Sequence, residues 1–149
     1  MNFDPTCIFC KIVARSALAA ILYENDGALA FLDLNPLPEG HTLVIPKTHC
    51  RNLYDFPDDA ARDVLSASRV VANALRDALN ADGISLFLAS ERAGGQDIFH
   101  AHFHLYPRWN DDGFSRGGRA RDESRIRRGD GSREGLEKLA EKIRAQIRE

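Results

Sequence analysis

The sequence predicts an α+β fold in which helices pack on a five-stranded, mainly antiparallel sheet. Two observations favour this fold. Short apolar segments with strand character are separated by turn signals, whereas one long segment, from Asp58 to Asn80, has apolar residues at helical spacing. The chain has 149 residues and a hydrophobic content of 44%, which suit one core, so we expect residues 1–149 to form a single domain.

The first half of the chain predicts one short helix and three strands. The helix covers about residues 6–14. Strands follow at residues 22–24 and 29–33, and Asn25-Asp26-Gly27 between them is a hairpin signal. Residues 35–40 contain two prolines and a glycine, which fix turns and withhold donors, so regular structure resumes only in the third strand, residues 41–46.

The second half predicts the main helix, two strands and a terminal helix. Asp58 and Asp59 suit the N-terminus of the main helix by charge, and Gly83 follows its end. The fourth strand covers residues 84–89 and the fifth about 99–108. Residues 110–131 are dominated by glycine, arginine and aspartate, which predicts a flexible loop too polar to pack unaided. The C-terminal helix, residues 132–149, has an apolar stripe formed by Leu136, Leu139, Ala140, Ile143 and Ile147.

Composition and charge restrict the function classes. A net charge of −2 gives no general attraction to nucleic acid or anionic membrane, and no segment approaches the roughly 20 apolar residues of a membrane span. Residues 1–5 lack the basic and apolar character of a signal sequence, so we expect a cytoplasmic protein whose three cysteines form no disulfide framework. A role in attracting phosphates stays open for the arginines of the loop, Arg116, Arg119, Arg121, Arg125, Arg127 and Arg128.

Three histidines, His100, His102 and His104, alternate with apolar residues in the fifth strand. A β-strand would place all three imidazoles on one face and the apolar residues against the core. Alternate residues advance by roughly 6.6 Å, so the outer two histidines would lie about 13 Å apart, too far to share one metal ion. Either two neighbours share a metal while the third has another task, or a neutral imidazole acts as a nucleophile that its neighbours orient.

The chain resembles the histidine triad (HIT) family of nucleotide hydrolases and transferases. The His-x-His-x-His motif is preceded by Ala93-Gly94-Gly95-Gln96. Other segments that resemble the family, in the family's order between about residue 6 and Arg108, are Cys7-Ile8-Phe9-Cys10-Lys11-Ile12, Ala30-Phe31-Leu32-Asp33, Gly40-His41-Thr42-Leu43-Val44-Ile45-Pro46-Lys47 and His49. This resemblance implies two-fold homodimers in which two five-stranded sheets join edge to edge into ten strands.

The resemblance also implies a catalytic set. His102 would attack the α-phosphate of a nucleotide, displace the attached group and leave a nucleotidyl-histidine that water cleaves. His104 would contact phosphate oxygens, and Gln96 would hydrogen-bond the bridging or leaving atom. The backbone at Gly95 would let a phosphate approach closely.

The implied substrate is a nucleotide, with a purine base favoured. Asp33 aligns with the carboxylate that accepts hydrogen bonds from ribose hydroxyls. Two further expected contacts, Ser90 and Asp97, depart from the commoner family pattern, which puts rate and leaving-group preference in doubt; an ionised Asp97 repels a phosphate unless it is turned outward. The apolar base pocket aligns with Ile8, Phe9, Ile12, Phe31 and Leu34.

Family members with the Cys7-x-x-Cys10 pair bind structural zinc with it and with histidines that match His49 and His100. Such a site has four N/S ligands and no open position, as structural zinc requires. Redox chemistry is disfavoured because no strand precedes the pair, and plain packing of two small side chains is the alternative. His41 is left either beside the triad or in a local hydrogen bond.

We therefore expect a nucleotide hydrolase or nucleotidyl transferase that acts on a nucleoside phosphate conjugate and carries structural zinc. Two other classes stay open. One is a zinc-stabilised nucleotide-binding or interaction module with little turnover, which Ser90 and Asp97 motivate. The other is a metal-dependent hydrolase that uses two histidines of the triad.

Overall fold

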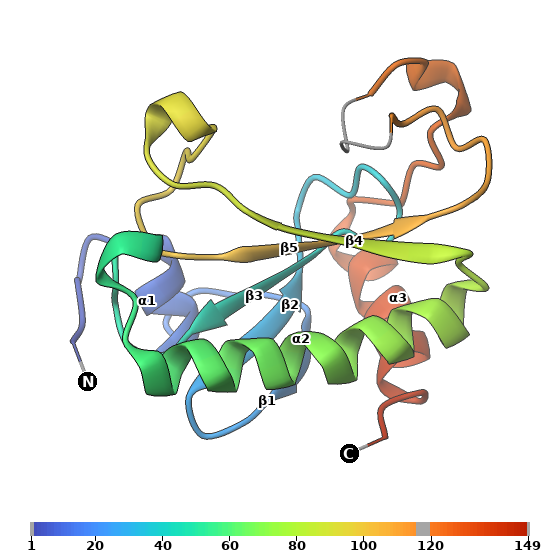
Figure 1. Cartoon of the computed structure of the whole chain (residues 1–149). Helices are drawn as coiled ribbons and strands as arrows, with labels where there is room; N and C mark the ends of the chain where they lie inside the picture. The colour runs from blue at the N-terminus through green and yellow to red at the C-terminus, as the bar shows by residue number, and fades with distance from the viewer. Residues whose placement is uncertain (1, 116–119, 149) are drawn as a thin grey trace.

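A five-stranded antiparallel sheet lies at the centre of the protein (Figure 1). In this computed structural model, which describes residues 2–115 and 120–148, the strands run in the order β1-β2-β3-β5-β4, and every neighbouring pair is antiparallel. Their bounds are β1 (Ile21–Glu24), β2 (Ala28–Leu32), β3 (Thr42–Pro46), β4 (Gly83–Leu88) and β5 (Phe103–Arg108). The predicted α+β fold is confirmed.

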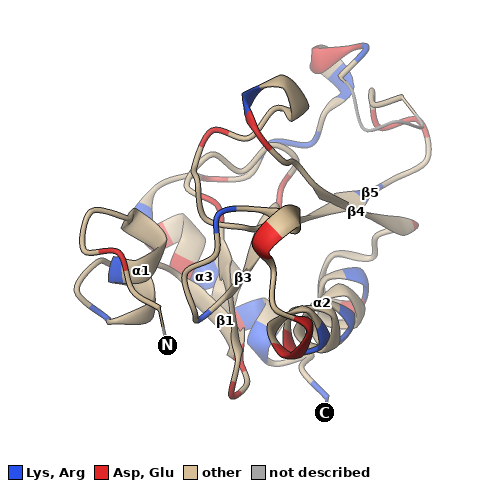
Figure 2. Ribbon diagram, turned by 60° about the vertical axis from the view of Figure 1, so that its left-hand side comes forward, with Lys and Arg blue, Asp and Glu red and all other residues tan. Residues whose placement is uncertain are grey.

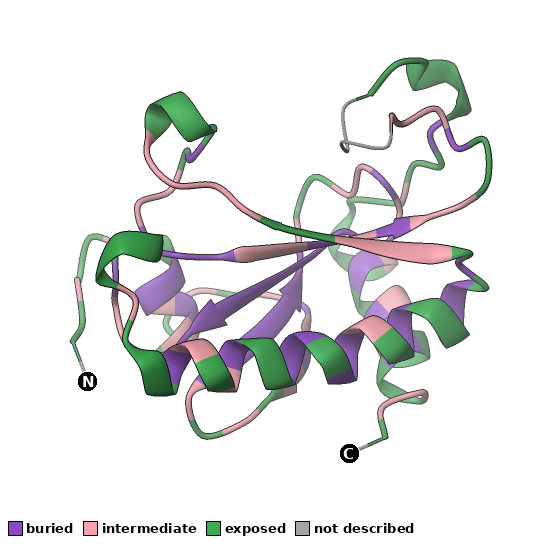
Figure 3. Cartoon of the chain, viewed as in Figure 1, coloured by how far each residue is buried: buried purple, intermediate pink, exposed green. Residues whose placement is uncertain are grey.

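Helices α2 (Asp58–Leu79) and α3 (Arg133–Arg144) cover one face of this sheet. The apolar residues of α2 fall on one side, which is buried, while its other side is exposed (Figure 3). Val64, Val71 and Leu75 are inaccessible to solvent and pack with Val44 and Leu105 of the sheet. None of the helices in the described residues is both long enough and apolar enough to cross a membrane.

The C-terminal helix begins where the sequence predicts and ends earlier. Ser132 caps α3, because its Oγ accepts a hydrogen bond of 3.0 Å from the backbone N–H of Gly135. The helix ends at Arg144 instead of continuing to residue 149. The predicted apolar stripe is buried at Leu136, Ala140 and Ile143, and it adds a second helix to the core on this face.

The other face carries the short helix α1 (Ile8–Val13). Phe9 and Ile12 of α1 pack on β2 and β3. Strand register places Leu43 opposite both Phe31 and His104, and His104 opposite Phe87, so these side chains share this face. Loops, and no α-helix of the described chain, lie over the β5 part of the face in Figure 1.

The described part of the predicted loop, residues 110–115 and 120–131, contacts the turn at residues 35–40. The N–H of Glu39 donates to the Arg127 carbonyl (2.7 Å), and the N–H of Gly129 donates to the Pro36 carbonyl (3.1 Å). Ile126 is buried, and a 3₁₀ turn covers Glu123–Arg125. Among the arginines, Arg127 pairs with Glu39 and Arg128 with Glu123, whereas Arg116 and Arg119 lie outside the described residues.

Acidic and basic segments both occur on α2 and in the loops around the sheet (Figure 2). Many of these charges are used in local pairs, such as Arg108 with Asp112 and Lys138 with Glu134. This distribution agrees with the small net charge of −2.

The prediction that all three triad histidines lie in one strand was wrong. Strand β5 begins at Phe103, so it contains His104 but neither His100 nor His102. The N–H of Ala101 instead donates to the carbonyl of Cys50 (2.8 Å), a segment outside the sheet. The chain bends at residues 98–100, and the ring centroids of His102 and His104 are 4.8 Å apart, closer than the roughly 6.6 Å between alternate residues of a strand.

Candidate active site

Four predicted metal ligands meet between α1, the segment after β3 and the bend before β5. The ligand atoms of Cys7, Cys10, His49 and His100 all lie within 4.8 Å of one another. The Sγ atom of Cys10 lies 3.4 Å from Nδ1 of His49 and 3.7 Å from Nδ1 of His100, and the Sγ atom of Cys7 lies 3.5 Å from the same His100 nitrogen. Two sulfurs and two imidazole nitrogens therefore converge on one point.

Hydrogen bonding prepares His100 as a ligand. Its Nε2 lies 3.0 Å from the carbonyl oxygen of Pro46, which can only accept, so the ring proton sits on Nε2 and the Nδ1 lone pair faces the sulfurs. Burial lowers the pKa of His100 to about 4 and raises the pKa of the Cys10 thiol. A neutral imidazole suits a metal, whereas a buried thiolate needs a nearby cation, so this donor set fits a bound zinc ion.

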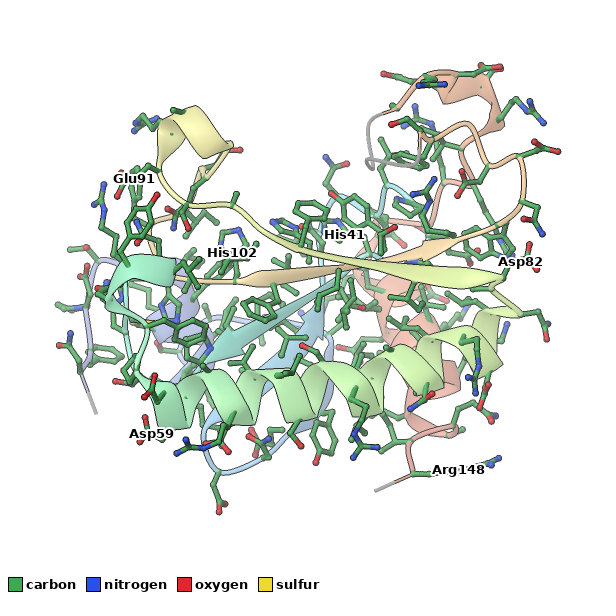
Figure 4. All side chains as sticks on the ribbon, viewed as in Figure 1. His41, Asp59, Asp82, Glu91, His102 and Arg148 are labelled. Carbon is green, nitrogen blue, oxygen red and sulfur yellow. The ribbon has the colours of Figure 1, made fainter. Side chains whose placement is uncertain are left out.

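His102 lies on the sheet side away from α2, as does His41 (Figure 4). Nδ1 of His102 lies 2.7 Å from the carbonyl oxygen of His100, so Nδ1 carries the proton and Nε2 keeps a free lone pair. The side chain is 6% exposed. Burial lowers the pKa of His102, while Asp33 and Asp97 oppose this shift through their charges. His102 is therefore a neutral imidazole whose free nitrogen is that of a nucleophile.

His104 and His41 lie next to His102 and contact each other. The ring centroids of His102 and His104 are 4.8 Å apart, and Nδ1 of His104 lies 2.9 Å from Nε2 of His41. Phe87 stacks on His104 with centroids 4.5 Å apart. Burial lowers the pKa of His41 to about 4 and that of His104 to about 3, so both rings are neutral at pH 7.

Asp33 lies beside His41, with its Oδ2 3.4 Å from Nδ1 of that ring. The His41 ring donates a hydrogen bond to the backbone of Asn35, which opposes the lowering of its pKa by burial. Nε2 of His41 then accepts a hydrogen bond from Nδ1 of His104, which leaves Nε2 of His104 as an acceptor beside His102. Of the two placements considered for His41, the structure shows the one beside the triad.

An apolar pocket of about 190 Å³ adjoins these histidines on the side of α1. Phe9 connects the two, because its ring lies 5.6 Å from Phe31 and 5.2 Å from His102 between centroids. All the predicted base-pocket residues line it, together with the carboxylate of Asp33. The lining consists of Ile8, Phe9, Ile12, Leu18, Ala19, Phe31, Leu32, Asp33, Leu34, Leu43 and Ile98.

The loop after β4 carries the remaining predicted residues. Gly95 has a φ of 92°, a conformation that favours glycine, and Asp97 is close enough to affect His102 electrostatically. The hydroxyl of Ser90 accepts a hydrogen bond of 3.4 Å from the N–H of Leu53. The buried amide of Gln96 contacts the backbone of Glu91, Arg51 and Ile98. Gln96 would have to break these bonds to reach a leaving atom.

Comparison with known proteins agrees with this geometry. The HIT domain model matches residues 15–111. The chain belongs to the histidine triad (HIT) family. The HIT family comprises nucleotide-binding hydrolases and transferases. This chain is 42% identical over 115 residues to Protein hit of Bacillus subtilis. The matched region covers 76% of this chain and 79% of that protein.

Two HIT relatives have names that state an activity. An adenylylsulfatase of Arabidopsis thaliana is 39% identical over 68% of this chain and 52% of its own length. An adenosine 5′-monophosphoramidase of Saccharomyces cerevisiae is 35% identical over 72% of this chain and 65% of its own length.

Two solved HIT structures share the fold over nearly the whole of this chain. A Hit-like protein of Bartonella henselae superimposes with a TM-score of 0.80 and 35% identity, covering 98% of this chain and 100% of that one. A zinc-bound histidine triad protein of Mycobacterium smegmatis superimposes with a TM-score of 0.79 and 34% identity, covering 95% and 92%. The predicted family and fold are thus confirmed.

Sequence reasoning missed several residues of this HIT site. Phe87 stacks on His104, and register alone could have found it once β4 and β5 were paired. Leu18, Ala19 and Ile98 join the pocket from loops. No periodic pattern marks loop residues, because their placement depends on the elements that they join.

We expect His41 to make folding stability depend on pH. Its pKa is about 4 in the folded protein and about 6.5 when exposed, so the unfolded chain binds more protons between these values. This contribution is complete above pH 6.5 and is lost as pH falls toward 4, on the order of 3 kcal/mol in all. Urea unfolding at pH 7 and pH 5 measures it. The loss between these pH values should be smaller in His41→Gln; an identical loss in both proteins would contradict the assignment.

Proposed function

We propose that this protein cleaves the bond at the α-phosphate of a purine nucleoside phosphate conjugate, through a nucleotidyl-histidine on His102, and passes the nucleotidyl group to water or another acceptor. The observation that carries the proposal is the 2.7 Å contact between Nδ1 of His102 and the His100 carbonyl, which holds the ring neutral with Nε2 free. This nitrogen lies beside an apolar pocket that ends in a carboxylate.

The first step transfers the nucleotidyl group to the protein. Nε2 of His102 forms a bond to phosphorus, and the leaving group departs with the electrons of its own bond to phosphorus and takes up a proton from solvent water. The His100 carbonyl accepts from Nδ1–H and so stabilises the positive charge that the imidazole acquires. In the second step water attacks phosphorus, and the phosphorus–nitrogen electrons return to His102.

His104 assists the second step from β5. Nε2 of His104 is an acceptor when its Nδ1–H is donated to His41, so it can take the proton that the attacking water loses. Protonated His104 would then face the phosphate oxygens. Ser90, Gly95 and Asp97 would border the phosphate from the loop after β4.

The nucleoside would occupy the pocket lined by Phe9 and Phe31. Asp33 lies at one end of this pocket and offers carboxylate oxygens to ribose hydroxyls. The two relatives named for an activity act on a sulfate and on an amide of adenosine monophosphate. We therefore infer an adenylyl conjugate as the substrate class, with a leaving group that is small or amine-bearing.

Replacement of His102 tests the mechanism. His102→Ala should fold and bind adenosine monophosphate but lose turnover by roughly 10³-fold or more, whereas His104→Ala should lose less because it only assists. Rapid quenching with adenosine 5′-phosphoramidate, followed by mass analysis that preserves phosphoramidates, should find the adduct on the peptide that contains His102.

Three further results would distinguish the rival functions. Tight adenosine monophosphate binding by the wild-type protein without any turnover would favour a binding module. Turnover that stops when a chelator is added, in protein that stays folded, would favour a metal-dependent hydrolase. Near wild-type turnover by His102→Ala would refute the covalent mechanism.

We propose that Cys7, Cys10, His49 and His100 bind a structural zinc ion. The convergent N/S donor set supports this, as does the zinc bound to the related protein of Mycobacterium smegmatis. Cysteine thiolates persist as ligands in a reducing compartment, so we also propose that the protein is cytoplasmic.

Metal analysis of purified protein should find about one zinc per chain. Cys10→Ala should lose the zinc and a large part of the stability, because binding to a closed site contributes directly to folding. Cys50→Ala is the matched control, since Cys50 is also buried but lies outside the cluster. Zinc-free protein with an unchanged melting temperature would exclude the site.

We propose a two-fold homodimer that joins two β4 edges. Strand β4 is an edge strand, and Leu86 and Phe87 are 45% and 39% exposed on it. An apolar cavity of about 630 Å³ lies between β4 and α2, bordered by Leu65 and Leu86. A second copy would cover this surface and continue the sheet.

Leu65→Glu together with Leu86→Glu should convert the dimer into a monomer, because each places a charge in the joined surface. Sedimentation equilibrium measures the mass. Leu53→Glu, a similarly exposed leucine outside this surface, is the control and should stay dimeric. A wild-type protein that is monomeric at high concentration would exclude the dimer.

A further inference from the structure

A group of polar side chains joins the loop after β4 to the segment that follows His49. The carboxylate of Glu91 accepts hydrogen bonds from Nε and Nη2 of Arg51, both of 2.8 Å, and from Nδ2 of Asn52, of 2.7 Å. The N–H of Glu91 donates to Oε1 of Gln96 (2.8 Å), and Nε2 of Gln96 donates to the carbonyl of Arg51 (2.6 Å). We call these four residues, Arg51, Asn52, Glu91 and Gln96, the Glu91 network.

The network holds an unusual backbone conformation. Glu91 has φ 62° and ψ 164°, a region that glycine adopts readily and other residues rarely do. Such a conformation persists only where the surroundings determine it strongly. Besides the side-chain bonds, the carbonyl of Glu91 accepts from the N–H groups of Gly94 and Gln96, both at 3.0 Å.

This arrangement differs from an ordinary surface ion pair. Exposed pairs contribute little on their own, and the side chains of Arg51 and Glu91 are 50% and 42% exposed. Their partners Asn52 and Gln96, however, are each 1% exposed and have their amides occupied by this network and adjacent backbone. Arg51 lowers the pKa of the Glu91 carboxyl to about 2, so the carboxylate stays charged throughout the working pH range.

The loop that the network fixes reaches the candidate active site. Asp97 follows Gln96 directly and acts on His102 through its charge. Ile98, whose carbonyl accepts from Gln96, lines the nucleoside pocket. Figure 4 shows Glu91 in the loop on the same side of β5 as His102. None of the four network residues lines the nucleoside pocket, so the network supports this loop from outside the pocket.

We propose that Glu91 is a positioning residue whose carboxylate, held by Arg51 and Asn52, fixes the loop of residues 90–98 so that Asp97 and Ile98 take their places beside His102 and the nucleoside pocket. This inference rests on the proposed function. Arg51 and Asn52 also follow the zinc ligand His49, so the network links the loop to the zinc site through a few residues of chain.

Glu91→Gly removes the carboxylate but keeps a residue that can adopt the backbone conformation of Glu91, so it tests the role of the carboxylate alone. Glycine adopts this conformation without strain, so the variant should keep its melting temperature within a few degrees. Its kcat for adenosine 5′-phosphoramidate should fall at least about 10-fold, because displacement of groups at the reacting centre by about 1 Å is costly. Its KM should change less than about threefold, since α1 and β2 supply most of the nucleoside pocket.

Four further variants complete the test. Glu91→Gln keeps one acceptor oxygen and should restore part of the lost kcat. Arg51→Gln should also lower kcat, though less than Glu91→Gly, because the bond from Asn52 to Glu91 remains. The double variant should be no worse than Glu91→Gly, since the loss of Glu91 already removes the Arg51 contact. Glu134→Gln breaks an ion pair on α3 that is more exposed than the Arg51–Glu91 pair and lies on the other face of the sheet, and it should leave kcat unchanged.

The outcomes distinguish this inference from the proposed function. Wild-type kcat in Glu91→Gly would overturn the positioning role. If the wild-type protein does not turn over the phosphoramidate, the proposed function fails, and hydrogen exchange of the peptide that spans residues 90–98 decides the inference alone. Faster exchange of that peptide in Arg51→Gln supports it, and unchanged exchange overturns it.

Discussion

His100 is the residue on which the rest of the site depends. Its ring faces the two cysteines through Nδ1 and is fixed by Pro46 through Nε2, while its carbonyl accepts the Nδ1 proton of His102. One residue therefore determines both the geometry of the cysteine cluster and the tautomer of the proposed nucleophile. His100 makes these contacts from a bend and not from a regular strand, and the next residue, Ala101, donates its N–H to the carbonyl of Cys50.

Burial keeps the histidines of this site neutral. The pKa values of His41 and His104 fall because their rings leave water, and the pKa of His102 shifts in the same direction. A neutral imidazole has one donor and one acceptor, so each hydrogen bond fixes the direction of the next. Because the His41 ring donates to the backbone of Asn35, its Nε2 accepts from His104, and the acceptor that remains on His104 lies beside His102.

The sequence predicted the elements of the fold well, because their signals are local. The periodicity of α2, the cap of α3 and the hairpin after β1 all depend on residues close together in the chain. The predicted start of β5 was wrong because it depends on the distant residue Cys50. The contact of His41 with His104 likewise requires the register of β3 against β5. Nothing in Glu91 signals a glycine-type backbone conformation, and its partner Arg51 lies 40 positions away in the chain.

The two faces of the sheet differ in what they bury. On one face α2 and α3 bury an apolar core that needs no polar group from the site. On the other face polar side chains are buried among Phe9, Phe31 and Leu43, where an unpartnered group would be costly. In the described residues no buried side-chain nitrogen or oxygen lacks a hydrogen-bond partner. The groups proposed for catalysis are consequently held in place before any ligand binds, so binding energy is not required to order them.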